Sequence, residues 1–194
     1  MIRDFDKDLI LDGIPDKDTH KTTTSIKFKK DLIDAFSDDS YGEATVLEIG
    51  THMGHTTKVL SYLFKKVITI NVNPIDDNYI CKDIDNIEHI VMDSYRLEGW
   101  PKWKNISVVL IDAIHNYEAI KKDIQNSLKL PHVGDRYLVF DDYGNRIHSE
   151  VKRAIDESIN NNLLIKVGGI GYPPQSLVND MIFDDWEGLI CQVK

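Results

Sequence analysis

The sequence predicts an α/β fold: a doubly wound, mostly parallel sheet with an antiparallel strand at its C-terminal end. Short, nearly continuous apolar runs recur along the chain, as in strands that are covered on both faces. Stretches with apolar residues at helical spacing separate them, which favours right-handed crossovers and a parallel sheet. The last two runs have no helix between them and are expected to close the sheet as a pair.

The elements follow in order along the chain. A helix is expected at 25–36, where Ile26, Ile33 and Phe36 have helical spacing, and further helices at 55–64, 116–130 and 147–159. The expected strands are 45–50, 67–72, 87–93, 107–112, 136–142, 163–169 and 186–193. Pro74 ends the second strand, and Pro131 ends the helix at 116–130. Residues 1–24 are rich in Asp and are expected to form a loosely held arm ahead of a single domain, 25–194.

Composition narrows the class of protein. With 194 residues, 42% hydrophobic and 28% charged, the chain is expected to be one soluble globular domain. Its net charge of −9 disfavours nucleic acid as a partner, because phosphate binding needs a basic face. No apolar run reaches the ~20 residues of a membrane span, and the acidic start is unlike a signal peptide. Cys81 and Cys191 are far apart, which suggests buried thiols in the cytoplasm.

The first predicted strand ends in a glycine-containing loop. In doubly wound sheets, ligands bind at the carboxyl ends of the strands. Gly50 and Gly54 would let a ligand approach the backbone there, and the carboxylate of Glu48 suits an amine or a sulfonium better than a phosphate. The spacing is not the dinucleotide fingerprint, and no lysine of a phosphate loop follows. An ordinary strand-to-helix turn is the plain alternative.

Two later strands end in carboxylates. Asp112 follows one strand, and Asp141 and Asp142 follow the next. If the strands are neighbours, about 4.8 Å apart, the carboxylates repel and a hard cation such as Mg²⁺, Mn²⁺ or Ca²⁺ would relieve them. His115 lies three residues beyond Asp112, and a neutral imidazole with a pKa near ~6.5 is a suitable general base. Alternatively, these side chains only cap loops and a helix.

These motifs carry a family resemblance. LEIGTHMGHTT (47–57) resembles the first motif of class I S-adenosylmethionine-dependent methyltransferases. VLIDAIHNYEAIKKDI followed by YLVFDDYG resembles their metal-dependent O-methyltransferase branch, which includes enzymes acting on sugars and macrolides, a cephalosporin-biosynthesis protein and, more distantly, the catechol type. The likeness runs from about Thr22 to the C-terminus. It implies methyl transfer from S-adenosylmethionine to the hydroxyl of a small molecule or saccharide.

The resemblance also assigns roles. Asp112, Asp141 and Asp142 match the ligands of Mg²⁺ or another hard divalent cation, and His115 matches the base. The residues expected to bind the cofactor are Glu48, Gly50, Thr51, His52, Gly54, Thr56, Asn71, Asp93, Ser94 and Asp112. Residues 22–24 are candidates to close over its methionine end.

One position departs from the family pattern. The second strand usually ends in Asp or Glu, which bonds the ribose, whereas this chain has Asn71. An amide lacks the charge-assisted strength of a carboxylate, so weaker cofactor binding is expected. Two alternatives stay open: a metal-dependent phosphohydrolase, and a catalytically inactive S-adenosylmethionine-binding module. The sequence identifies neither the acceptor nor the oligomeric state, for which a homodimer is one candidate.

Overall fold

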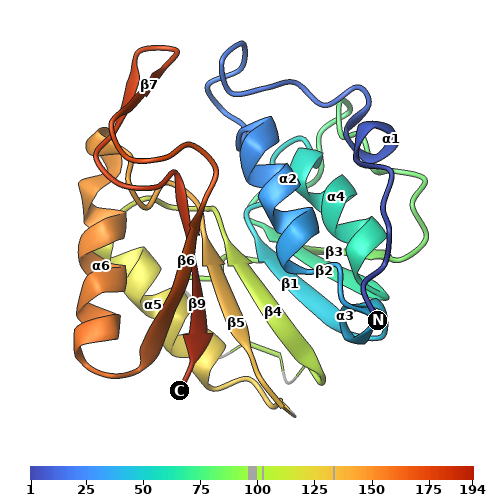
Figure 1. The fold of residues 1–194 in the computed structure, drawn as a ribbon. Coiled ribbons are helices and arrows are strands. Elements are labelled where there is room, and N and C mark those ends of the chain that lie inside the picture. Colours follow the sequence, from blue (N-terminus) through green and yellow to red (C-terminus); the bar gives the residue numbers. More distant parts are fainter. Residues whose placement is uncertain (96–99, 102, 133) are drawn as a thin grey trace.

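A seven-stranded sheet forms the centre of the protein. The computed structural model describes residues 1–95, 100–101, 103–132 and 134–194, and the sheet has the strand order β3-β2-β1-β4-β5-β9-β6 (Figure 1). The strands are β1 (Thr45–Ile49), β2 (Lys66–Asn71), β3 (Ile87–Val91), β4 (Ile106–Ile111), β5 (Tyr137–Phe140), β6 (Leu164–Ile170) and β9 (Gly188–Val193). The first five are parallel, and β9 is antiparallel to both β5 and β6. The predicted fold class is confirmed.

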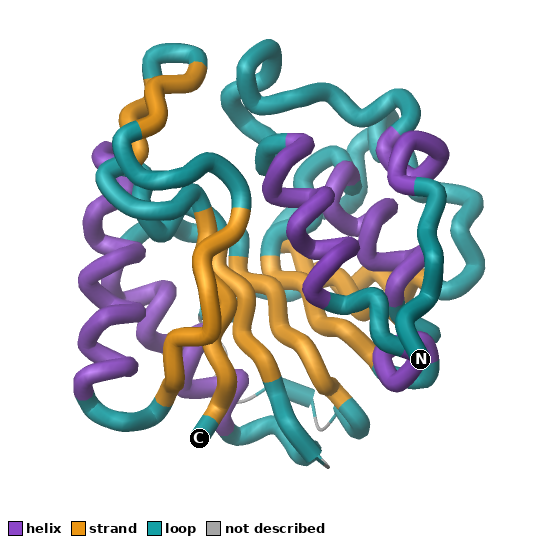
Figure 2. The backbone as a smooth tube through the Cα atoms, viewed as in Figure 1, coloured by secondary structure: helices purple, strands orange, loops and turns teal. Residues whose placement is uncertain are grey.

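Helices cover both faces of the sheet (Figure 2). On one face lie α1 (Lys7–Leu11), α2 (Ile26–Ala35) and α4 (His55–Leu63), packed on side chains such as Val46 and Val108. On the other face α5 (Tyr117–Leu128) and α6 (Ser149–Asn160) pack on Leu47 and Val109. Because side chains alternate along a strand, each central strand supplies both cores. Two further short elements are α3 (Asp39–Gly42) and a 3₁₀ turn (Arg146–His148).

The N-terminal segment is packed onto the domain, which corrects the expectation of a loosely held arm. Ile10, Leu11 and Ile14 are buried in the core between α1, α2 and α4. Lys17 is only 2% exposed. Three apolar side chains within a short stretch bury enough surface to hold the segment in place. The Asp-rich composition masked this, because the apolar residues are few and lie between carboxylates.

A two-stranded hairpin that the sequence analysis missed lies between β6 and β9. It consists of β7 (Ser176–Val178) and β8 (Met181–Phe183). Its turn residues Asn179 and Asp180 have φ angles of 48° and 64°, the left-handed pair that tight hairpin turns require. In Figures 1 and 2 the hairpin and the loop before α2 rise at the same end of the sheet. Among the described residues, no helix has both the length and the apolar character to cross a membrane.

Candidate active site

A cavity of about 670 Å³ lies at the carboxyl ends of the parallel strands. Its size falls within the range of small-molecule sites. The N-terminal segment contributes Lys17, Thr22 and Thr23 to its wall, and the hairpin contributes Asp180 and Met181. Of the residues predicted to bind the cofactor, the following line the cavity: Gly50, His52, Asn71, Asp93, Ser94 and Asp112. All three predicted metal ligands and His115 also line it.

Gly50 brings the ends of β1 and β4 together. Its φ is +101°, and a Cβ built on it would lie 1.7 Å from the carbonyl oxygen of Asp112. The protein's own backbone therefore fills the space beside this glycine. Gly54 begins α4 with a φ of +83°, and a Cβ there would lie 2.4 Å from the ring of Tyr79. Both glycines are required for close approach within the protein, besides any approach to a ligand.

Glu48 is turned away from the cavity. Its carboxylate accepts hydrogen bonds from the hydroxyls of Thr57 and Thr69, each at 2.6 Å, and the residue is 1% exposed. Burial raises the pKa of this carboxyl to about 8, against the two hydrogen bonds, which lower it. Glu48 is thus a largely protonated acid at neutral pH that ties β1 to β2 and α4.

Thr51 and Thr56, both predicted to bind the cofactor, stabilise the loop after β1 from outside the cavity. The hydroxyl of Thr51 lies 2.6 Å from that of Thr69, and the hydroxyl of Thr56 lies 3.1 Å from that of Thr24. Both residues are buried. With Glu48 and Gly54, they form the support of the loop after β1 and do not line the cavity.

The side of the cavity next to β2 and β3 is polar at its ends and apolar between them. The side-chain amide of Asn71 donates to the carbonyl of Asn73 at 3.1 Å. Asp93 accepts a hydrogen bond from the backbone of Tyr95 at 3.2 Å, and Ser94 is buried. Ile70, Val72 and Met92 supply apolar surface to the wall between them. A flat, partly polar group such as a nucleoside fits this combination.

The two aspartate-bearing strand ends are neighbours, which was the condition for their carboxylates to come together. In the β4–β5 pair, Ile111 is opposite Phe140, so Asp112 and Asp141 follow at the same edge. Asp141 and Asp142 are each 5% exposed. Burial raises the pKa of Asp141 well above its usual range, although the charge of Lys17 opposes this. Burial acts in the same direction on Asp142, but the charges of Lys17 and His115 outweigh it and lower its pKa.

A lysine that the sequence analysis did not single out lies among these carboxylates. The ammonium nitrogen of Lys17 is 3.6 Å from Asp141 Oδ2, 3.6 Å from Asp142 Oδ1 and 3.2 Å from Glu187 Oε1. Burial lowers the pKa of Lys17, but the carboxylates together outweigh it and raise the pKa above the usual lysine range. Lys17 is therefore a permanent cation at the edge of the sheet.

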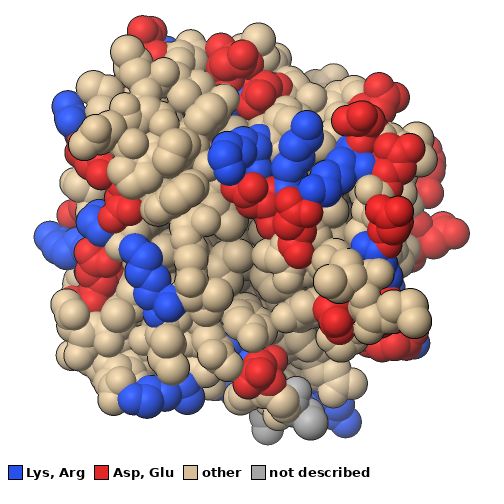
Figure 3. All heavy atoms as spheres, in the orientation of Figure 1, with Lys and Arg blue, Asp and Glu red and all other residues tan. Residues whose placement is uncertain are grey.

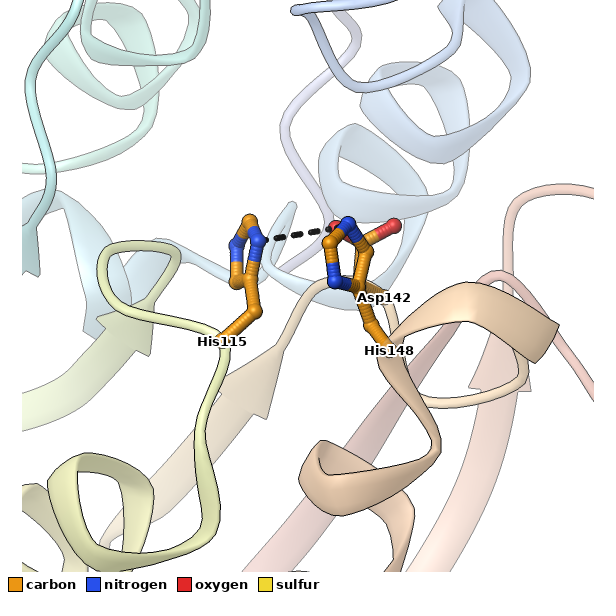
Figure 4. A group of neighbouring side chains, drawn as sticks. All are labelled: His115, Asp142 and His148. Carbon is orange, nitrogen blue, oxygen red and sulfur yellow. Dashed lines mark ion pairs between the residues drawn. The ribbon is translucent and has the colours of Figure 1, made fainter.

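His115 lies between the carboxylates of Asp112 and Asp142, the second of which is drawn beside it in Figure 4. Its Nε2 is 3.4 Å from Asp112 Oδ1, and its Nδ1 is 3.5 Å from Asp142 Oδ2. Burial lowers the pKa of the imidazole, but the hydrogen bond to Asp112 and the charges of Asp142, Asp112 and Asp141 outweigh it and raise the pKa to about 9. In this arrangement the ring carries a second proton at neutral pH.

His148 is a second histidine at the site, also missed in the sequence. Its Nε2 lies 3.6 Å from Asp142 Oδ2, and its ring centroid is 4.4 Å from that of His115. Burial lowers the pKa of His148, so this ring is the more neutral of the two. The short turn at Arg146–His148 brings it over the strand ends, and nothing in its local sequence indicates this.

The side chains that converge at the strand ends differ from the predicted Mg²⁺ ligands Asp112, Asp141 and Asp142. Among the described residues, the ligand atoms that converge within 4.8 Å belong to His115, Asp142 and His148. Two imidazoles and one carboxylate suit a transition metal better than Mg²⁺, which prefers oxygen. Moreover, the ammonium of Lys17 lies between Asp141 and Asp142. The residues present therefore do not fit a Mg²⁺ centre.

Comparison with solved structures identifies the fold. The chain superposes on the N-methyltransferase NodS from Bradyrhizobium japonicum WM9 in complex with S-adenosyl-L-homocysteine, with a TM-score of 0.63, 17% identity, and 97% of this chain and 92% of that chain covered. A SAM-dependent methyltransferase from Aquifex aeolicus gives 0.58 at 17% identity, with coverage of 98% and 100%. The Bacillus cereus O-methyltransferase in complex with S-adenosyl-L-homocysteine gives 0.58 at 17% identity, with coverage of 86% and 79%. The chain thus has the class I methyltransferase fold. No family model matches the sequence, and no curated protein matches it significantly.

Proposed function

We propose that this protein is an S-adenosylmethionine-dependent methyltransferase. One observation carries the proposal: the cavity lies where this fold binds ligands, and its walls contain Gly50, Asn71, Asp93 and Asp112 at the ends of successive strands. Two structures of similar fold hold S-adenosyl-L-homocysteine, the product form of the cofactor.

The wall residues suggest how the cofactor would lie. Asn71 is at the end of β2, where its amide can bond ribose hydroxyls, and Asp93 and Ser94 follow β3, where an adenine would lie against Met92. The methionine part would then extend past Gly50 toward Thr22 and Thr23. Asp112 would lie near the sulfonium, whose positive charge it would stabilise.

We further propose a hydroxyl of a small molecule or saccharide as the acceptor. The acceptor end of the cavity holds His115, His148 and Asp142, together with Ile114 and Ile147. On the face seen in Figure 3, Lys and Arg side chains alternate with Asp and Glu over the N-terminal segment and α2, which argues against a nucleic acid as acceptor.

These positions support a direct transfer of the methyl group. The acceptor oxygen attacks the methyl carbon, the carbon–sulfur bond breaks with its electron pair staying on sulfur, and the hydroxyl proton passes to a base. His115 can take that proton at Nε2 once its own second proton has left. Holding oxygen, methyl and sulfur in line contributes much of the rate gain. Mg²⁺ has no role in this reaction, since the residues at the ends of β4 and β5 do not fit it.

Calorimetry with S-adenosylmethionine, S-adenosyl-L-homocysteine and ATP tests the proposal. We expect the two sulfur ligands to bind and to raise the melting temperature, with ATP much weaker. A mixture of hydroxyl compounds incubated with methyl-labelled cofactor should then yield a labelled product. Binding of ATP with phosphate release would favour a phosphohydrolase instead. Cofactor binding with no transfer to any acceptor class would favour the inactive binding module.

A further inference from the structure

We infer that Lys17 is a tethered cation that takes the place of a divalent metal at the ends of β4 and β5, so that the protein does not bind Mg²⁺ there. The binding part of this inference is independent of the proposed function. Its catalytic consequence, methyl transfer without a metal, rests on that function. Lys17 belongs to the N-terminal segment, outside the strand-end motifs.

Three carboxylates surround the ammonium of Lys17. Its nitrogen lies 3.6 Å from oxygens of Asp141 and Asp142 and 3.2 Å from Glu187. Lys17 is 2% exposed and Glu187 is fully buried, so water screens these charges little. Glu187 also accepts hydrogen bonds from the backbone of Ser25 at 2.9 Å and of Tyr172 at 3.0 Å. These bonds fix its carboxylate beside the ammonium.

The backbone around Lys17 is held as firmly as its side chain. Asp16 Oδ1 accepts hydrogen bonds from the backbone nitrogens of Lys17 at 2.7 Å and of Ile26 at 2.9 Å, which joins the loop to the start of α2. From the hairpin, the Asn179 side chain donates to the Lys17 carbonyl at 3.3 Å. The ring of Phe183 lies 5.6 Å from the ammonium. The lysine therefore cannot leave without breaking contacts from three parts of the chain.

A divalent ion and this ammonium exclude each other. An ion bound to both Asp141 and Asp142 would lie within a few ångströms of Lys17 Nζ, because the same two carboxylates hold the lysine. Like charges this close in a buried site repel strongly. The ammonium also holds Asp142 in position, and Asp142 in turn lies 3.5 Å from His115 Nδ1. Lys17 thus acts as a positioning residue for the histidine.

The test measures Mn²⁺ binding by electron paramagnetic resonance, with Mn²⁺ as a spectroscopic substitute for Mg²⁺. Wild-type protein should bind Mn²⁺ only weakly, at about millimolar levels or above, whereas Lys17→Met should bind it at least ~100-fold more tightly. Lys17→Arg, which keeps the cation, should stay as weak as wild type. Lys21→Met is the matched control, since Lys21 lines the same cavity but is exposed. This variant should bind Mn²⁺ as weakly as wild type.

Thermal melting gives a second measurement. Lys17→Met leaves carboxylates unpaired, so it should melt at a lower temperature than wild type, and MgCl₂ should raise the melting temperature of this variant alone. Micromolar Mn²⁺ binding by wild type that Asp141→Asn abolishes would overturn the inference even if Lys17→Met does not fold, because Asp141 is outside the His115, Asp142 and His148 cluster. A folded Lys17→Met that gains no affinity would also overturn it. If the inference and the proposed function both hold, wild type transfers methyl at full rate in excess chelator. Failure to bind S-adenosylmethionine would refute only the proposed function.

Discussion

Replacing Glu48 by Gln tests the assignment of this residue to the support of the site. Its carboxyl accepts hydrogen bonds from Thr57 and Thr69, and burial raises its pKa from 4.5 to about 8. A glutamine keeps an oxygen that can accept both hydrogen bonds and cannot ionise. The substitution therefore isolates the effect of ionising a buried acid.

The sign of the effect follows from proton binding. Between pH 4.5 and about 8 the unfolded chain has lost the Glu48 proton and the folded chain keeps it. The free energy of unfolding is therefore highest below pH 4.5 and falls as the pH rises through about 8. At about 1.4 kcal/mol for each pH unit, the two pKa values give a ceiling of about 5 kcal/mol. Because water entry and relaxation reduce this, we expect Glu48→Gln to be more stable than wild type by roughly 2–4 kcal/mol at pH 9 and nearly equal at pH 5.

Urea unfolding followed by tryptophan fluorescence at pH 5, 7 and 9 measures this difference. Glu43→Gln is the control, since Glu43 is exposed and bonded to Lys65, and it should show no gain in stability at alkaline pH. Identical pH dependence in wild type and Glu48→Gln would refute the reasoning. Calorimetry on the same variant should show S-adenosylmethionine affinity unchanged within about twofold, because the carboxyl faces away from the cavity. A tenfold loss would show that Glu48 contacts the cofactor, as the sequence motif predicted.

Four further predictions concern residues that line the cavity. If His115 is the base, turnover should rise about tenfold for each pH unit up to a pKa near 9, and Asp142→Asn should move this rise to lower pH; a flat profile would contradict the role. His115→Ala should lower turnover by roughly 10²-fold with cofactor affinity kept, as followed by labelled-methyl transfer. Asn71→Asp should tighten S-adenosylmethionine binding by ~1 kcal/mol in calorimetry, and no change would mean that Asn71 does not face the ribose. Gly50→Ala should prevent folding or lower the free energy of unfolding by more than ~3 kcal/mol, because its Cβ would meet the Asp112 carbonyl. Gly134→Ala is the control, since Gly134 also has a positive φ but open space around it, and melting experiments should show a loss of only ~1 kcal/mol.

Much of the fold could be predicted because its signals are local. Runs such as SVVLID and helical spacing such as that of Ile120 and Ile124 are set by which faces an element buries, and the strands appeared within a few residues of their predicted ends. The β7–β8 hairpin was missed because its strands are only three residues long. The packing of the N-terminal segment was missed because a few apolar residues among many acidic ones have little weight in composition.

The candidate site also has a part that the sequence predicts and a part that only the folded chain brings together. The sequence by itself determined that Asp112, Asp141 and Asp142 each follow a strand and that His115 lies three residues beyond Asp112, since strand ends follow from the apolar pattern. The tertiary structure made these two strands neighbours. Only the tertiary structure decided which cation balances them. Lys17 and Glu187 are 170 residues apart and meet through packing of the N-terminal segment against the last strand's loop. Contacts from distant parts of the chain place the Lys17 ammonium at the ends of β4 and β5, and no local sequence pattern predicts such a placement.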